Sequence, residues 1–233
     1  MSVSVIIPAA GFGRRMRSTV NKQNLLLDGR PVLAHTIDLF ERHHLIDHIV
    51  LVTAASEVDA CCTEIVERFG FTKVVAVVAG GDERQDSVRL GLLACPGDDA
   101  TVVLVHDGVR PFFCGSLLPE LVARVRKEGA CIVAVPVKDT IKQVEEGKIV
   151  STPDRKSLWQ AQTPQGFLLG PLRKAHEAAL LAGFRGTDDA SLLERMGLPV
   201  VVLEGNYRNI KITTPEDMVL ARAFIVDSGA IQG

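Results

Sequence analysis

Short apolar, β-branched runs alternate along the chain with segments whose apolar residues recur at helical spacing. The apolar runs predict strands at residues 4–8, 48–54, 73–79, 101–106, 131–135 and 199–203, and a last short strand at 209–212. The intervening segments predict helices at residues 32–40, 57–69, 87–93, 117–127, 172–182 and 190–196. This alternation is typical of an α/β fold with a mostly parallel, twisted sheet and helices on both faces.

Residues 137–151 break the alternation. Polar and apolar residues alternate on both sides of Glu145, Glu146 and Gly147, which predicts a β-hairpin without a helix attached. An isolated hairpin is only marginally stable, so it must lie on another surface. Two arrangements stay open: the hairpin folds back on its own domain, or it embraces a second subunit.

The first predicted strand runs into a glycine loop rich in cations. Gly11 and Gly13 have no Cβ, so backbone N–H groups there can approach an anion closely. The basic side chains that would neutralise the anion are Arg14, Arg15, Arg17 and Lys22. Such a loop is suited to holding polyphosphate, and the alternative is an ordinary strand-to-helix turn with exposed arginines.

Two common glycine motifs do not match this loop. A dinucleotide fingerprint requires glycine where the chain has Met16, and an acidic residue at the end of the second strand, where the chain reads Leu51-Val52-Thr53. The P-loop pattern requires Gly-Lys followed by Ser or Thr, which the chain lacks. A nicotinamide or flavin cofactor is therefore disfavoured, and a nucleotide loop of another kind is left.

Polar segments also follow two other predicted strands, at residues 80–84 and 106–111. The carboxyl ends of parallel strands meet at one edge of a sheet, so we expect these segments and the glycine loop to converge there. Asp107 could bind a ribose hydroxyl or a metal, or pair with Arg110 in a structural salt bridge. Ser87 could cap a helix or contact a base. Lys211 could lie on a solvated face or bind phosphate.

Composition narrows the class of protein. The 233 residues are 47% hydrophobic, which predicts a single α/β domain over residues 1–233. A net charge of −2 offers no general basic field for nucleic acid. The five cysteines include no C-x-x-C pair, which favours a reducing compartment. No signal peptide or membrane span is expected, so the prediction is a cytoplasmic protein.

Together these motifs resemble the 2-C-methyl-D-erythritol 4-phosphate cytidylyltransferases of the non-mevalonate isoprenoid pathway, over residues 3 to 225. The resemblance rests on eight pieces in order. They are Pro8-Ala-Ala-Gly-x-Gly-x-Arg15-Met16, Lys22-Gln23, Gly80-Gly-Asp-Glu-Arg-x-Asp-Ser87-Val88, His106-Asp107-x-x-Arg110-Pro111, Asp139-Thr140, Asp154-Arg155, Gln162-Thr163-Pro164-Gln165 and Asn209-Ile-Lys211-Ile-Thr213.

The resemblance implies a Rossmann-like nucleotidyltransferase fold and transfer of CMP from CTP to the polyol phosphate, with release of pyrophosphate. It implies catalytic roles at the triphosphate for Arg15, Lys22 and Lys211. The CTP-binding residues would be Pro8, Ala9, Ala10, Gly11, Gly81, Asp82, Ser87, Asp107 and Gly108. The residues that bind the polyol phosphate would be Arg110, Thr140, Arg155, Thr163 and Thr187.

The resemblance further implies a homodimer joined through the arm formed by residues 137–155, with Arg155 reaching the partner's site. It implies Mg²⁺ held mainly by the CTP phosphates rather than by protein ligands. No general base is required, because a phosphate monoester is already ionised at neutral pH.

Two departures from the family pattern leave alternatives open. Asn21 and Asn24 flank Lys22-Gln23 where Pro and Tyr are usual, and Gly108-Val109 replaces the usual Ala-Ala. A Val before this Arg is familiar in ribitol 5-phosphate cytidylyltransferases, which make CDP-ribitol and are the alternative. A nucleotide-sugar pyrophosphorylase, a non-catalytic nucleotide-binding module and an oxidoreductase fit the cations and the chain length less well.

Overall fold

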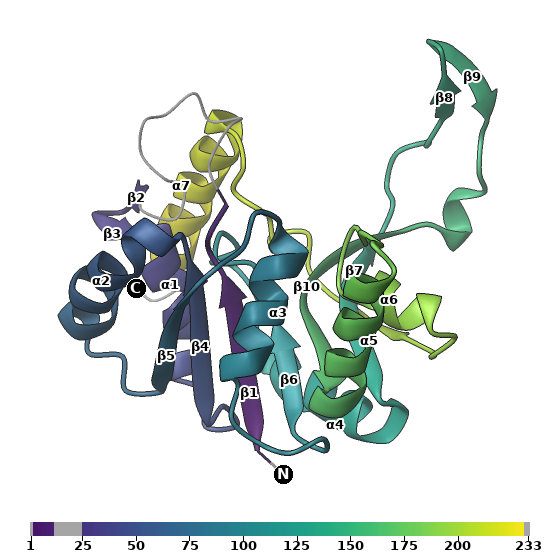
Figure 1. The fold of residues 1–233 in the computed structure, drawn as a ribbon. Helices are drawn as coiled ribbons and strands as arrows, with labels where there is room; N and C mark the ends of the chain where they lie inside the picture. Colours follow the sequence, from purple (N-terminus) through teal and green to yellow (C-terminus); the bar gives the residue numbers. More distant parts are fainter. Residues whose placement is uncertain (1, 12–24, 231–233) are drawn as a thin grey trace.

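A seven-stranded sheet forms the centre of the molecule, whose computed structural model describes residues 2–11 and 25–230 (Figure 1). The strand order is β11-β7-β10-β6-β1-β4-β5, and β10 runs antiparallel to β6 and β7 while the other pairs are parallel. The strands are β1 (Val3–Pro8), β4 (His48–Thr53), β5 (Val74–Ala79), β6 (Val102–Val105), β7 (Ala130–Pro136), β10 (Trp159–Leu168) and β11 (Val201–Glu204). The prediction of a mostly parallel sheet is confirmed.

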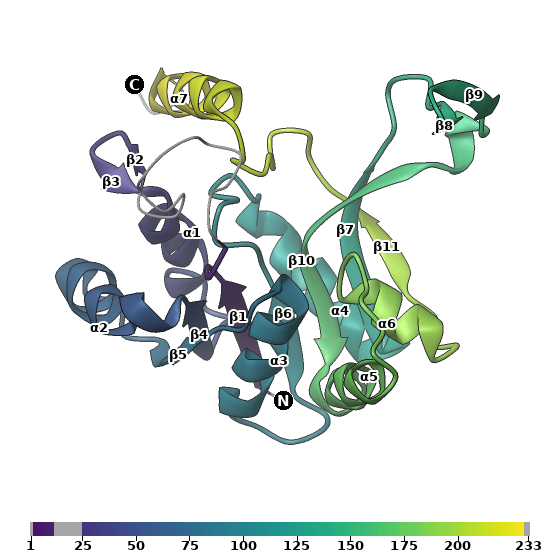
Figure 2. The same cartoon turned by 45° about the horizontal axis from the view of Figure 1, so that its top comes forward.

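Helices cover both faces of the sheet, as the alternation predicts (Figure 2). Along β1, Val5 and Ile7 pack on one face and Ile6 packs on the other. The first face carries α1 (Val32–Glu41), α2 (Val58–Cys61) with its π-helical continuation Cys62–Glu67, and α4 (Leu118–Glu128). The second face carries α3 (Arg84–Ala94), α5 (Leu169–Leu181) and α6 (Ala190–Arg195).

Helix α3 lies close against the sheet because position 91 is glycine. A Cβ at Gly91 would lie 2.7 Å from Cγ2 of Ile6 and 2.8 Å from Cγ2 of Val52, much closer than carbon atoms pack. The close approach places the first turn of α3, with Arg84 and Ser87, beside the carboxyl ends of the strands.

The C-terminal helix α7 (Pro215–Ala230) begins with a capping box. The N–H of Asp217 donates to Oγ1 of Thr214 at 3.3 Å, and the N–H of Thr214 donates to Oδ2 of Asp217 at 2.8 Å. The helix packs on the short ribbon of β2 (Leu26–Leu27) and β3 (Arg30–Pro31) in a small separate cluster that includes Ile212.

Three local features differ from what the sequence indicated: one predicted strand is absent, one strand was missed, and one of the two interpretations of Ser87 is ruled out. Residues 209–212 form no strand; Ile212 packs in the α7 cluster instead of joining the sheet. Strand β10 was not predicted, because polar residues and Pro164 interrupt its apolar pattern. Ser87 is not an N-cap, since α3 already begins at Arg84 and its N-cap position is Glu83.

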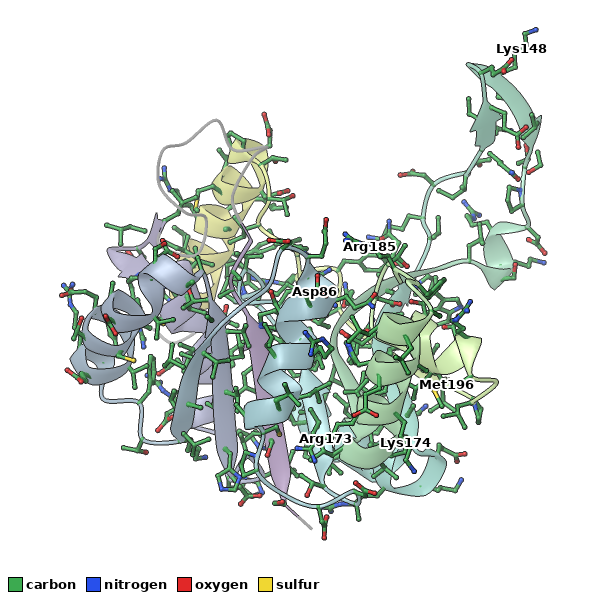
Figure 3. All side chains as sticks on the ribbon, viewed as in Figure 1. Asp86, Lys148, Arg173, Lys174, Arg185 and Met196 are labelled. Carbon is green, nitrogen blue, oxygen red and sulfur yellow. The ribbon has the colours of Figure 1, made fainter. Side chains whose placement is uncertain are left out.

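The predicted hairpin is confirmed and projects from the body as an arm (Figure 1). Its strands β8 (Gln143–Glu145) and β9 (Lys148–Ser151) pair antiparallel, and every residue in them is exposed. The turn residues Glu146 and Gly147 have φ of 49° and 78°, as a two-residue type I′ turn requires. In Figure 3, Lys148 marks the outer tip of this arm, far from the sheet.

Candidate functional site

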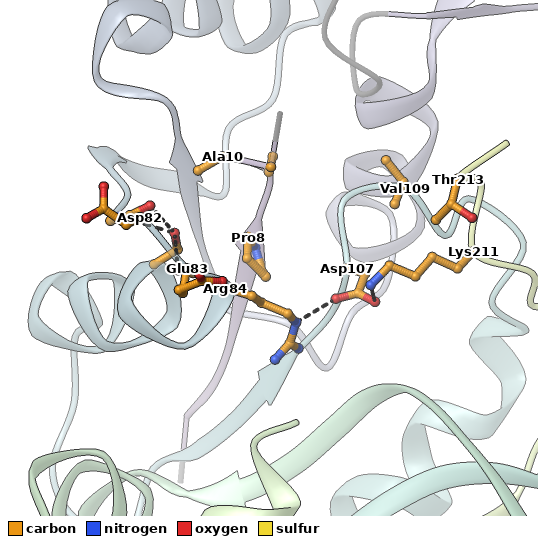
Figure 4. Close-up of a pocket in the computed structure, with 13 residues that line it drawn as sticks. Pro8, Ala10, Asp82, Glu83, Arg84, Asp107, Val109, Lys211 and Thr213 are labelled. Atoms are coloured by element: carbon orange, nitrogen blue, oxygen red, sulfur yellow. Dashed lines mark hydrogen bonds and ion pairs between the residues drawn. The ribbon is translucent and has the colours of Figure 1, made fainter. Parts of the chain in front are cut away.

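A cavity of about 200 Å³ lies where the three strand ends converge (Figure 4). The end of β1 and the loop after it contribute residues 8–11. The loop after β5 and the start of α3 contribute residues 81–84 and Ser87, and the turn after β6 contributes Asp107 and Val109. Lys211 and Thr213 close it from the segment before α7. The predicted convergence of the strand ends is confirmed.

The side chain of Asp107 is buried at this cavity and lies within ion-pair distance of three basic side chains. Oδ1 lies 2.9 Å from Nε of Arg84, while Oδ2 lies 2.8 Å from Nζ of Lys211 and 3.4 Å from Nε of Arg110. Burial alone would raise the pKa of Asp107, but Arg84, Lys211 and Arg110 hold it well below its usual range. The carboxylate therefore stays ionised, and it fixes the positions of three basic groups at one edge of the sheet.

The turn that carries Asp107 is held by a chain of hydrogen bonds through His106. The N–H of Asp107 donates to Oγ1 of Thr163 at 3.1 Å, and Oγ1 lies 3.1 Å from Nδ1 of His106. Nε2 lies 3.0 Å from the carbonyl oxygen of Arg110, which can only accept, so Nε2 carries the hydrogen and Nδ1 accepts from Thr163. Desolvation lowers the pKa of His106 to about 4, which keeps the ring neutral.

A second cavity, of about 250 Å³, adjoins the first. Arg84, Asp107 and Lys211 line both cavities and form the wall between them. The second cavity is also lined by residues of β10 and of the loop before α6, namely Ala161, Gln162, Thr163, Gln165, Thr187 and Asp188, together with Arg110. Two ligands bound in these cavities would meet at a wall that carries two fixed cations and one carboxylate.

Arg84 also pairs with a second buried carboxylate, that of Asp189. Its Nη1 lies 2.8 Å from Oδ2 of Asp189, and Oδ1 of Asp189 lies 3.2 Å from Nε2 of His176 on α5. Asp189 and His176 are each 1% exposed. Burial would raise the pKa of Asp189, but Arg84 and the hydrogen bond from His176 lower it. The guanidinium of Arg84 is thus fixed between two carboxylates.

Sequence reasoning gave no role to Arg84, Asp189 or His176. Arg84 belongs to the polar segment at residues 80–84 that follows a predicted strand, and this position could have indicated a role at the site. Asp189 occupies the N-cap position of α6, but its side chain makes no capping bond there; Oδ1 of the neighbouring Asp188 accepts from the N–H of Ser191 at 3.0 Å instead. His176 carries no sequence signal, since a lone histidine on a helix is common.

The structure brings together most of the residues predicted to bind CTP. Those that line the first cavity are Pro8, Ala9, Ala10, Gly11, Gly81, Asp82, Ser87 and Asp107. Gly108 lies beneath it, where a Cβ would be 3.1 Å from Leu33 and 3.2 Å from Ala9. The hydroxyl of Ser87 accepts from the N–H of Gly81 at 3.2 Å and so ties α3 to the loop. Val109 and Thr213, which were not predicted, also line this cavity.

The residues predicted to bind the polyol phosphate fall into two groups. Arg110, Thr163 and Thr187 line the second cavity. Thr140 and Arg155 are exposed on the arm and do not line either cavity of their own chain. Arg15 and Lys22 belong to residues 12–24, outside the described part of the chain.

Two further observations concern metals and membranes. Within residues 2–11 and 25–230, no three His, Cys, Asp or Glu side chains come together as a set that could hold a metal ion. None of the helices in the described ranges combines the length and apolar character needed to cross a membrane.

Comparisons with known proteins agree with this geometry. The family model described as IspD: 2-C-methyl-D-erythritol 4-phosphate cytidylyltransferase matches residues 3–227. Proteins of that name from Syntrophotalea carbinolica and Geotalea uraniireducens are 56% and 54% identical, over 100% and 97% of both chains respectively. The crystal structure of 4-diphosphocytidyl-2C-methyl-D-erythritolsynthase from Anaerococcus prevotii has a TM-score of 0.83 at 35% identity, covering 96% of each chain.

Proposed function

The chain belongs to the 2-C-methyl-D-erythritol 4-phosphate cytidylyltransferase family, and from this membership we propose how its residues carry out the reaction. It transfers CMP from CTP to 2-C-methyl-D-erythritol 4-phosphate, releasing pyrophosphate and forming 4-diphosphocytidyl-2-C-methyl-D-erythritol. The observation that carries the site assignment is the pair of adjoining cavities with a shared wall of Arg84, Asp107 and Lys211.

The first cavity is the proposed CTP site. Backbone groups of residues 8–11 would face the base and ribose, while Gly81, Asp82 and Ser87 would read the cytosine. Asp107 would lie on the ribose side, over the close-packed Gly108. Lys211, with Arg15 and Lys22 of the glycine loop, would bind the triphosphate.

The second cavity is the proposed polyol phosphate site, lined by Arg110, Thr163 and Thr187. This division bears on the departure from the family pattern at residues 108 and 109. Val109 lines the first cavity, on the CTP side, and Gly108 is packed beneath it. Neither residue lines the second cavity, so this departure gives no support to ribitol 5-phosphate as the preferred substrate.

The chemistry requires charge compensation more than proton transfer. An oxygen of the ionised monoester attacks the α-phosphorus of CTP, a new P–O bond forms, and the bond to the β-phosphate breaks as pyrophosphate leaves. Two anions must approach, and at ~4 Å and an effective dielectric near 20 each unlike pair of unit charges is worth about 4 kcal/mol before desolvation. Arg15, Lys22 and Lys211 would supply this stabilisation, and the shared wall would align the two substrates.

Mg²⁺ is the proposed cofactor. The described residues fit an ion that enters with the nucleotide, because Asp107 is already surrounded by Arg84, Arg110 and Lys211 and has little negative charge left to offer a metal. Mg²⁺ commonly keeps several waters and binds phosphate oxygens, whose charge it neutralises. The role of the protein is then to hold the triphosphate rather than the ion.

We also propose a cytoplasmic homodimer that exchanges its arms. Thr140 and Arg155 do not line their own chain's cavities, and the arm exposes Val144, Ile149 and Val150 by half or more. A second copy beneath the arm would cover these apolar side chains and receive Thr140 and Arg155 in its polyol phosphate site. The five free cysteines support a reducing compartment.

The direct test of the function measures pyrophosphate release from CTP and Mg²⁺, with 2-C-methyl-D-erythritol 4-phosphate and ribitol 5-phosphate in parallel assays. Release with the methylerythritol phosphate alone is expected. Release mainly with ribitol 5-phosphate would overturn the substrate and keep the proposed site, whereas no release with either would contradict the reaction itself.

A further inference from the structure

The arm leaves the body between β7 and β10, and a side chain from another part of the sequence holds its root. Tyr207 lies in the segment after β11, and its hydroxyl donates to the carbonyl oxygen of Pro136, the last residue of β7, at 2.7 Å. The ammonium of Lys138, on the first leg of the arm, lies 3.5 Å from the centre of the Tyr207 ring. A cation over an aromatic face is attracted at this distance, so Tyr207 contacts both the end of β7 and the first leg of the arm.

Lys138 connects this contact to Arg155. Nη1 of Arg155 donates to the carbonyl oxygen of Lys138 at 2.7 Å. One residue nearer the body, the N–H of Val137 donates to the carbonyl oxygen of Leu158 at 3.0 Å, which joins the two legs at the root. The position of Arg155 therefore depends on the residue that Tyr207 holds.

The backbone that carries Tyr207 is itself fixed to the sheet. Nε2 of Gln162 on β10 donates to the carbonyl oxygen of Asn206 at 3.1 Å. On the other side, Nδ2 of the buried Asn209 donates to the carbonyl oxygen of Thr163 at 2.8 Å. Figure 2 shows this segment, between β11 and α7, running past the upper ends of β7 and β10. The chain on both sides of Tyr207 is thus hydrogen-bonded to β10.

We propose that Tyr207 is a positioning residue for the arm: it sets the direction in which the arm leaves the body, and so places Thr140 and Arg155 at the partner's polyol phosphate site. The inference rests on the proposed exchange of arms, because only a second copy offers that site. An arm that swings presents Arg155 in the productive place only part of the time. The affinity for the polyol phosphate then falls by the fraction of time lost.

Two substitutions separate the two contacts of Tyr207. Tyr207→Ala removes both, and we expect it to raise KM for the polyol phosphate about tenfold, whereas Tyr207→Phe keeps the ring and raises it about threefold. KM for CTP should stay within about twofold, because the CTP site does not include the arm. Arg208→Ala is the matched control: Arg208 lies in the same segment but faces α7, with Nη1 2.7 Å from Asp227.

A spectroscopic readout reports the arm root directly. Trp159 is the only tryptophan of the chain, and it pairs with Pro136 across β10 and β7. If Tyr207 holds this root, Tyr207→Ala exposes Trp159 more fully, so quenching of its fluorescence by acrylamide increases. Unchanged quenching together with an unchanged KM would overturn the proposal.

Mixed dimers distinguish failure of this inference from failure of the dimer. When one copy carries Lys211→Ala, the intact site of the other copy takes its arm from the Lys211→Ala copy. Tyr207→Ala on the Lys211→Ala copy should raise KM, and Tyr207→Ala on the other copy should not. The reverse pattern, or no rise in either, overturns the role of Tyr207. If Arg155→Ala, placed in the same two ways, acts only within its own copy, the exchange of arms is wrong and the inference falls with it.

Discussion

Asp107 and Arg155 are both assigned to substrate binding, yet the chain holds them in contrasting ways. The carboxylate of Asp107 is 8% exposed and lies within ion-pair distance of Arg84, Arg110 and Lys211. Arg155 is exposed on the arm, where it donates to one backbone carbonyl. The first residue is fixed by its own chain, and the second has no such network around it.

The difference indicates where each residue completes its contacts. A buried carboxylate is tolerated only with partners, so the network around Asp107 is preorganised before any ligand arrives. Exposed charged residues contribute little to the free energy of folding. Folding of the arm therefore does not require Arg155 to keep one fixed position. The contrast favours a site with a rigid half built by the body and a second half delivered by another copy.

Loss of a triphosphate cation is the largest change expected on the rigid side. Lys211→Ala should slow turnover about a thousandfold, because a fixed positive charge at the reacting phosphates is removed. Lys22→Ala should act similarly. The measurement is kcat for pyrophosphate release, with circular dichroism to show that the fold persists. Lys174→Ala, an exposed lysine on α5, is the control, and near-normal turnover in either variant would remove that lysine from the mechanism.

The next largest difference is expected in the free energy of unfolding, which substitutions in the buried network around Arg84 should lower more than substitutions on the arm. Asp189→Asn removes the charge of a buried carboxylate that pairs with the partly exposed guanidinium of Arg84, so the free energy of unfolding should fall by about 3 kcal/mol. Lys142→Ala breaks an exposed contact to Thr152 on the arm and should change it by less than about 0.5 kcal/mol. Urea denaturation measures both. Similar small losses would show that the buried network is no more important to folding than the arm.

On the arm, the expected effect is on binding rather than on stability. Arg155→Ala should raise KM for the polyol phosphate about thirtyfold, because a charge-assisted contact to phosphate is lost. KM for CTP should not change. Lys156→Ala, the neighbouring exposed cation, is the matched control for lost charge. A change confined to the KM for CTP would contradict the assignment of Arg155.

A smaller effect is expected from His106, beneath the rigid half. Its pKa is lowered to about 4 by burial, against 6.5 in the unfolded chain, so the unfolded state binds more protons between these values. The free energy of unfolding should therefore fall as the pH falls, by about 1.5 kcal/mol from pH 6.5 to pH 5. Asp107 and Asp189, with lowered pKa values, lose their stabilising charge only below the ordinary range of aspartate, about pH 3.9.

Urea titrations at several pH values measure this dependence. His106→Gln removes the titrating ring, so its unfolding free energy should depend less on pH across the same window. An equally steep slope in the variant would assign the pH dependence to another group.

The sheet could be predicted from the sequence because parallel strands that are buried on both faces consist of continuous apolar runs. Strand β10 could not, because it buries polar side chains that are satisfied by distant parts of the chain. Gln165, 1% exposed, donates to Asp188 and accepts from the N–H of Asp189. Local hydropathy does not report such partners, and the same limit made residues 209–212 resemble a strand.

The convergence of strand ends was predictable because it follows from topology alone. The support behind the site was not, since Arg84 and Asp189 are separated by 105 positions and nothing local marks them as a pair. The hairpin was predictable from its alternating pattern, but its exposure was not, because the same pattern also fits a hairpin folded back on its own domain. The contact of Tyr207 with the arm depends on where the segment after β11 runs, which only the fold reveals.

The most direct test of the two-part site is complementation between Lys211→Ala and Arg155→Ala. Each homodimer carries one defect in both of its sites, so each should be impaired. In a mixed dimer with exchanged arms, one site carries both substitutions and the other carries neither. Random mixing should then restore about a quarter of the wild-type activity at low polyol phosphate concentration. If mixing restores nothing although mixed dimers form, each arm serves its own chain and the central claim is wrong.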